Sequence, residues 1–236
     1  MSAVIRQLGS RFFIIGVAHV LPSSSAEVRD TILRERPDIV AVELDPIRYA
    51  AMLQERKPRL SDVIRAGPNI ILLSALLYLT QGKFSRETGM PAGDEMLVAI
   101  KHANEVGAQV HFVDQYLGTT LQRLAKMMPL REKIRLVAEM LIGLLPVGKG
   151  FDLSGITDEQ VVSRILGDFK RISPTATEVL INERDDYMSQ RLVELLATGK
   201  KIVAVVGAGH VPGIYKKLVG LTSGRWSISL EYKAGV

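Results

Sequence analysis

The chain has 236 residues, of which 47% are hydrophobic and 23% charged, and this composition excludes a disordered or collagen-like protein. Thirty lysines and arginines against 25 acidic residues give a formal charge of +5, too small an excess to indicate a nucleic-acid partner. There is no cysteine, so disulfides, thiolate metal sites and a cysteine nucleophile are all excluded.

Strands alternate with helices along the chain. Apolar runs bounded by turn signals predict strands at residues 3–8, 11–16, 38–44, 109–113 and 201–206, with a last edge strand at 226–231. Helical periodicity between proline and glycine boundaries predicts helices at 23–36, 47–55, 91–104, 119–145 (broken near Pro129), 158–169 and 174–197, and a short one from Pro212.

This alternation predicts an α/β fold with a central mixed, largely parallel sheet of about four to six strands flanked by helices. We expect a single domain over residues 1–236. The helical stretches at about 61–89 and 119–197 are longer than crossover connections need, so we expect them to form a helical subdomain.

The most apolar run, residues 70–79, is about ten residues long, whereas a bilayer crossing needs roughly 20. We therefore expect a soluble, cytoplasmic chain in which other protein covers this run. A homodimer joined through the helical middle is the predicted cover, and burial in the core of a monomer is the alternative.

Glycines and polar residues follow the apolar strands. They are Gly16 and His19 after the first covered strand, Glu43 and Asp45 after the second, Asp114 after the third, and Gly207, Gly209 and His210 after the fourth. In an open α/β sheet, ligands bind beyond the carboxyl ends of the strands. If the strands are parallel neighbours, these residues meet at one edge and form the site.

Two histidines and one carboxylate can hold a divalent metal and leave a position open for water. His19, Glu43 and His210 are the predicted ligands, and Mn, Co and Zn are the candidate ions. Each residue also has a structural alternative: His19 as a helix cap, Glu43 paired with Arg48, and His210 at the start of the following helix. The glycines after the fourth strand do not predict a nucleotide site, because only 23 residues follow Gly213.

The chain resembles the TraB/PrgY family, which includes the bacterial pheromone-shutdown protein, from about residue 4 to 232. The motifs that carry the resemblance are Gly16-Val-Ala-His19, Glu43-Leu-Asp45, Glu95-Met96, Glu183-Arg184-Asp185 and Gly207-Ala-Gly-His210 with Pro212-Gly213. The family is similar to the Tiki metalloproteases and, more distantly, to erythromycin esterases and haem-binding ChaN-like proteins. The resemblance implies a metal or hydrolytic site that uses His19, Glu43, Arg184 and His210.

Two departures from the family pattern affect these expectations. Asp114 is followed by Gln115, where the family commonly has arginine, so a charge expected near the site is missing. Many microbial members continue into C-terminal membrane helices, whereas this chain ends at Val236. We expect a membrane link only if the chain is the soluble domain of a longer protein.

Together these features predict a metal-dependent hydrolase acting on peptides. Glu43 serves as ligand or general base, Arg184 stabilises the oxyanion, Glu95 assists catalysis, and Asp45 and Asp114 support the site or contact substrate. The alternative is a non-catalytic regulator that binds or sequesters a pheromone-like peptide or a small ligand in the same cleft.

Overall fold

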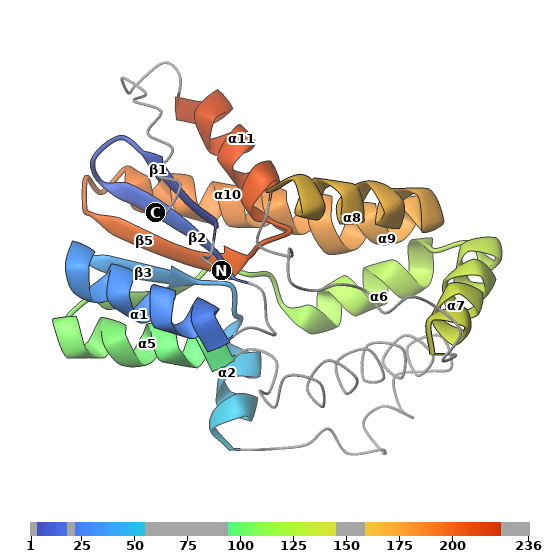
Figure 1. The fold of residues 1–236 in the computed structure, drawn as a ribbon, viewed down its shortest axis with the longest axis horizontal. Coiled ribbons are helices and arrows are strands. Elements are labelled where there is room, and N and C mark those ends of the chain that lie inside the picture. The colour runs from blue at the N-terminus through green and yellow to red at the C-terminus, as the bar shows by residue number, and fades with distance from the viewer. Residues whose placement is uncertain (1–3, 18–21, 55–93, 145–158, 223–236) are drawn as a thin grey trace.

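The computed structural model describes residues 4–17, 22–54, 94–144 and 159–222 (Figure 1). Within these residues one five-stranded sheet has the order β1-β2-β5-β3-β4. Its strands are β1 (Val4–Leu8), β2 (Phe12–Val17), β3 (Ile39–Val42), β4 (Gln109–Phe112) and β5 (Ile202–Gly207). β1 pairs antiparallel with β2, and the other neighbouring strands pair in parallel. The predicted mixed, largely parallel α/β sheet is confirmed.

The centre of the sheet is covered on both faces, which explains its unbroken apolar runs. All residues of β2, β3 and β5 are buried. Because side chains alternate along a strand, Ile15 and Val205 pack on one face while Ile14 and Ala204 pack on the other. β4 is an edge strand whose first residue, Gln109, is exposed.

Helices form a layer on each face of the sheet (Figure 1). α1 (Pro22–Glu35) and α5 (Asp94–Val106) cover one face, and α10 (Glu183–Leu196) and α11 (Val211–Thr222) cover the other. α2 (Pro46–Leu53) begins just beyond the carboxyl end of β3. α5 and α10 each precede a parallel strand, so both helices begin at the edge where the strands end.

A second group of helices lies beyond that edge, where the strand arrowheads point in Figure 1. It contains α6 (Leu117–Met127), α7 (Leu130–Leu144), α8 (Glu159–Ile172), α9 (Pro174–Thr177) and a π-helical turn, η2 (Glu178–Asn182). We call these elements the helical unit. Its small core consists of Leu124, Met128, Ala176 and Val179. The predicted subdomain at 119–197 thus includes α10, a helix that packs on the sheet instead.

One predicted helix is interrupted in the structure, and several predicted segments lie outside the described residues. The chain over 174–197 is not one regular helix, because η2 separates α9 from α10. The expected break near Pro129 is present between α6 and α7. The stretch 61–89, with the predicted dimer contact 70–79, and the strand 226–231 lie outside the described residues. No helix within the described ranges combines the length and apolarity that a membrane crossing requires.

Candidate functional site at the carboxyl edge of the sheet

Buried ionisable side chains gather at the edge where the parallel strands end. All six buried aspartates, glutamates and histidines among the described residues lie there: Glu43, Asp45, Glu95, Asp114, Asp185 and His210. They either follow a strand directly or occupy the first turn of α5 or α10. Burial of charge is costly unless each group has a partner, so this concentration marks the candidate site.

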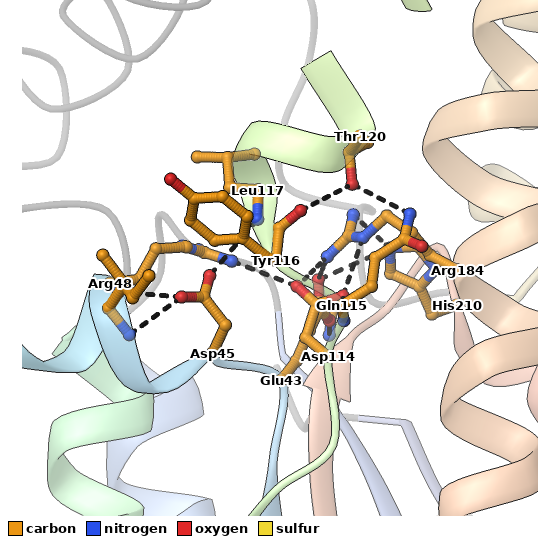
Figure 2. Close-up of polar contacts among 12 residues, drawn as sticks. Glu43, Asp45, Arg48, Asp114, Gln115, Tyr116, Leu117, Thr120, Arg184 and His210 are labelled. Carbon is orange, nitrogen blue, oxygen red and sulfur yellow. Dashed lines mark hydrogen bonds and ion pairs between the residues drawn. The ribbon is translucent and has the colours of Figure 1, made fainter. Parts of the chain in front are cut away.

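Arg184, in the first turn of α10, is the centre of the cluster (Figure 2). Its Nε and Nη2 donate to the two carboxylate oxygens of Asp114 at 3.0 and 2.7 Å, and Nη2 also donates to Glu43 Oε1 at 2.5 Å. Its Nη1 lies 3.1 Å from His210 Nε2 and donates to the carbonyl of Leu180 at 3.3 Å. A guanidinium has five N–H donors, and these contacts use all five.

The charge of Arg184 is held by its two carboxylate partners. Burial by itself lowers the pKa of an arginine, but the ion pairs with Glu43 and Asp114 outweigh burial and raise the pKa of Arg184 above its ordinary value. The guanidinium is therefore permanently charged. With every donor engaged, Arg184 must release one contact before it can reach a substrate oxyanion.

Glu43 has both carboxylate oxygens occupied. Oε1 accepts from Arg184, and Oε2 accepts from the backbone N–H of Gly207 at 2.6 Å. This second contact arises because β3 and β5 are neighbours, and Glu43 N–H donates to the Val205 carbonyl across the same ladder. The carboxyl end of β5 thus fixes the orientation of the glutamate that follows β3.

His210 lies between α10 and the end of β5. Its Nδ1 is 2.6 Å from Asp185 Oδ1, and its Nε2 is 3.4 Å from Glu43 Oε1. Burial raises the pKa of Asp185, while the contact with His210 opposes that change. The imidazole therefore has a buried carboxyl group behind it and faces Glu43 and Arg184 with its other nitrogen.

Asp114 joins two arginines that approach it from opposite sides in Figure 2. Arg48 Nη1 donates to Asp114 Oδ2 at 3.1 Å, the same oxygen that Arg184 Nη2 contacts. The Arg48 side chain is 34% exposed, and within the described part of the chain its other four donors have no partner. Among the residues that the structure describes, Arg48 is therefore the arginine of this site that has unpaired donors for a ligand.

Asp45 has a structural task at the same edge. Its Oδ1 accepts from the backbone N–H groups of Ile47 and Arg48 and so caps the N-terminus of α2. Its Oδ2 accepts from Leu117 N–H at 3.4 Å, which connects α2 to the start of α6. The cap sets the direction in which α2 presents Arg48 to Asp114.

The structure brings most of the predicted site residues together. Glu43, Asp114, Arg184 and His210 form one contact network with the Gly207 amide. Arg48 pairs with Asp114 rather than with Glu43, contrary to the structural alternative considered for Glu43.

The remaining predicted residues border this network or fall outside it. Gly16, in β2, pairs with Val206 of β5, and Gly209 lies in the turn before α11. Glu95 is buried at the start of α5, a helix on the face of the sheet opposite α10. His19 lies outside the described residues, two positions after the last described residue of β2.

The predicted metal site is represented by two of its three ligands. Among the described residues no group of three or more candidate ligands converges. Glu43 Oε1 and His210 Nε2 do converge, and a carboxylate with an imidazole oriented by a second carboxylate is a donor set that fits a divalent cation. His210 Nε2 has one lone pair, and this lone pair faces Arg184. A cation therefore binds at His210 only after Nε2 releases its contact with Arg184.

Sequence reasoning missed the roles of Asp185 and Arg48. Asp185 directly follows Arg184 in the first turn of α10. Its position beside a predicted site residue is the sequence signal that could have identified it as part of the site. Gln115, which stands where the resemblance implied an arginine, donates to Thr120 Oγ1 at 2.8 Å. Arg48 and Arg184 both neutralise Asp114, so the site does not depend on a charge at position 115.

Comparisons with known proteins identify the family of the chain. The chain is 34% identical over 226 residues to the uncharacterized protein MJ1365 of Methanocaldococcus jannaschii, covering 90% of this chain and 54% of that protein. It is 26% identical over 248 residues to the TraB domain-containing protein of Homo sapiens, covering 92% of this chain and 65% of that protein. The chain therefore spans about half to two thirds of the length of these relatives. The model of the TraB/PrgY/gumN family matches residues 3–222, and the chain belongs to that family.

Proposed function

We propose that the chain is a metal-dependent hydrolase that acts on peptides at the carboxyl edge of the sheet. The observation that carries the proposal is the approach of Glu43 Oε1 to His210 Nε2 at 3.4 Å, with Asp185 behind the imidazole. His19, Glu43 and His210 are the proposed ligands of a divalent cation, of which Mn, Co and Zn are the candidates. When bound, such a cation polarises a carbonyl and increases the acidity of water.

The chain's own residues then have separate tasks. Arg48 orients the substrate, because its side chain is partly exposed and four of its donors have no partner among the described residues. Arg184 contacts Glu43, Asp114 and His210 and so holds these three side chains close together. Glu43 is either a ligand of the cation or the general base, and as the base it accepts a proton once its contact with Arg184 is released. In this scheme Arg184 reaches a developing oxyanion only after that release.

A non-catalytic regulator that binds a peptide or small ligand is the second candidate. The observation that favours it is the full occupation of the site's polar groups: both Glu43 oxygens and all five Arg184 donors have partners. A site of this kind binds through Arg48 at its border and leaves its ligand intact. Both candidates place the ligand at the same edge, so the fate of the ligand distinguishes them.

The test combines cation titration with product analysis. We expect calorimetric titration with Mn, Co or Zn to show binding that Glu43→Gln and His210→Ala abolish. His102→Ala is the matched control, because that histidine pairs with Glu105 on α5 instead of joining the Arg184 cluster. In a peptide library, chelator-sensitive cleavage supports the hydrolase, and a bound peptide recovered intact supports the regulator. If the unaltered protein binds the cation no more strongly than Glu43→Gln and His210→Ala do, the proposed metal site is wrong.

A further inference from the structure

Asp185 and Gly213 belong to two separate motifs of the chain, and the scheme above uses only the place of Asp185 behind the imidazole and gives Gly213 no role. Asp185 lies in the first turn of α10 and is 3% exposed. Gly213 lies in the first turn of α11, three residues after His210. A Cβ atom built on Gly213 would lie 1.8 Å from Asp185 Oδ2 and 2.8 Å from its Cγ. Only glycine at position 213 leaves room for the Asp185 carboxyl group.

The neighbours of His210 determine which of its nitrogens carries the proton. An arginine has donors only, so the Arg184 Nη1 at 3.1 Å requires His210 Nε2 to accept. In a neutral imidazole the other nitrogen must then be protonated. His210 Nδ1 therefore donates to Asp185 Oδ1 at 2.6 Å, a distance typical of a hydrogen bond to a carboxylate.

We propose that Asp185 is a positioning residue that holds His210 in the Nδ1-protonated tautomer, and that Gly213 is required because it admits the Asp185 carboxylate. The pair keeps the Nε2 lone pair able to accept from Arg184, on the side of the ring that faces Glu43. A buried carboxylate behind a histidine fixes both ring orientation and tautomer in many sites. This inference goes beyond hydrolysis, because it concerns how the imidazole is held whether or not the site cleaves a substrate.

The steric half of the proposal is tested by a double-mutant cycle in urea unfolding. Gly213→Ala should lower the unfolding midpoint strongly, and the same change in an Asp185→Ala background should lower it much less. Gly220→Ala is the matched control on the same helix, since a Cβ there meets nothing within 4 Å. It should leave the midpoint unchanged or raise it slightly. An equal loss from Gly213→Ala in both backgrounds overturns the steric link.

The tautomer is tested by nitrogen NMR of protein labelled with ¹⁵N-histidine, in chelator at about pH 8, above the ordinary histidine pKa. The signals of His210 are assigned by their loss in His210→Gln. We expect a protonated Nδ1 and an unprotonated Nε2 in the unaltered protein, and a shift toward the other tautomer in Asp185→Asn, while His102 is unchanged. A protonated Nε2 in the unaltered protein overturns the proposal even if no variant folds. Because no metal or substrate is present, this result is independent of the proposed hydrolase.

Discussion

The sheet with its covering helices and the helical unit are held together by different forces. β2, β3 and β5 are wholly buried between two apolar layers. Among the described side chains, the helical unit buries only one small apolar cluster, around Leu124 and Val179, and exposes Met127, Leu130 and Ile134 on α6 and α7. Apolar burial at about 25 cal/mol per Å² therefore stabilises the sheet far more than the helical unit.

Polar contacts supply part of what the helical unit lacks in apolar burial. Arg123 of α6 donates twice to Glu183 of α10, at 2.6 and 2.7 Å. Glu132 of α7 accepts from Ser173 Oγ at 2.6 Å and from the Thr175 hydroxyl and amide. The candidate site lies where the two regions meet. Glu43, Asp45 and Asp114 follow strands, and Arg184 follows the last turn of the helical unit, so the sheet positions one half of the site.

The largest expected effect comes from removing the charge at this junction. Arg184→Met leaves Glu43 and Asp114 buried without their shared counter-charge, which should lower the free energy of unfolding by about 3–5 kcal/mol in urea titrations. Arg123→Met is the matched control, because it breaks a similar two-contact ion pair between an exposed arginine and a partly buried glutamate. A loss in Arg123→Met as large as that in Arg184→Met would contradict the assignment of Arg184 as the buried centre.

Two leucine truncations compare the two cores directly. Leu192 packs in the core under α10 and Leu124 in the small core of the helical unit, and both have 0% exposure. Leucine to alanine costs about 2–5 kcal/mol, and the cost falls where the site can collapse around the cavity. We expect the loss of unfolding free energy, measured by urea unfolding, to lie at the upper end of this range for Leu192→Ala and at its lower end for Leu124→Ala. Equal losses would show that the helical unit is packed as rigidly as the sheet.

A smaller effect is expected from the polar connection between α7 and α9. Glu132→Gln keeps the size of the side chain but weakens three hydrogen bonds from Ser173 and Thr175, so we expect a loss of about 1 kcal/mol. Hydrogen exchange should locate that loss in α7 and α9. Faster exchange in β5 as well would mean that the two regions unfold as one unit.

The stability that Glu132 contributes to the helical unit should depend on pH. Burial by itself raises the pKa of Glu132, but the hydrogen bonds from Ser173 and Thr175 outweigh it and lower the pKa below 4.5. The stabilisation is therefore present above the unfolded-state pKa of about 4.5 and is lost as pH falls through the lower folded-state value. The protection of helical-unit amides, corrected for the intrinsic effect of pH on exchange, should fall as the pH drops below 4.5, and Glu132→Gln should remove this component of the pH dependence.

The sheet and the position of the site are readable from local sequence, because apolar runs and the polar residues after them are local signals. Glu43, Asp114 and His210 each follow a strand, and parallel strands place their carboxyl ends at one edge. The partner of each charge is not readable in this way. Arg48 has Glu43 and Asp114 as candidate partners, and only the packing of α2 beside β4 selects Asp114.

The central role of Arg184 was also beyond local reasoning. It contacts Glu43 across 141 positions of sequence, and that contact depends on how α10 is rotated over the sheet. Its run of charges, Glu183 to Asp186, has the pattern of a solvent-facing surface. The saturation of its five donors requires the ends of β3, β4 and β5 and the turn η2 to meet around Arg184, which no single segment encodes.

The π turn η2 determines how the residues of α10 are rotated about the helix axis relative to those before the turn. Glu183 N–H donates to the Glu178 carbonyl, five residues back, so the turn holds one residue more than an α-helix would. One residue corresponds to a rotation of about 100° around a helix axis. If residues 178–182 closed into regular α-helix without losing a residue, Arg184 and Asp185 would turn together by this angle away from the sheet edge, whereas deletion of one residue within the turn would keep them in phase. The wide turn thus absorbs one residue, so that a single helical stretch serves the small core with its first half and the site with its second.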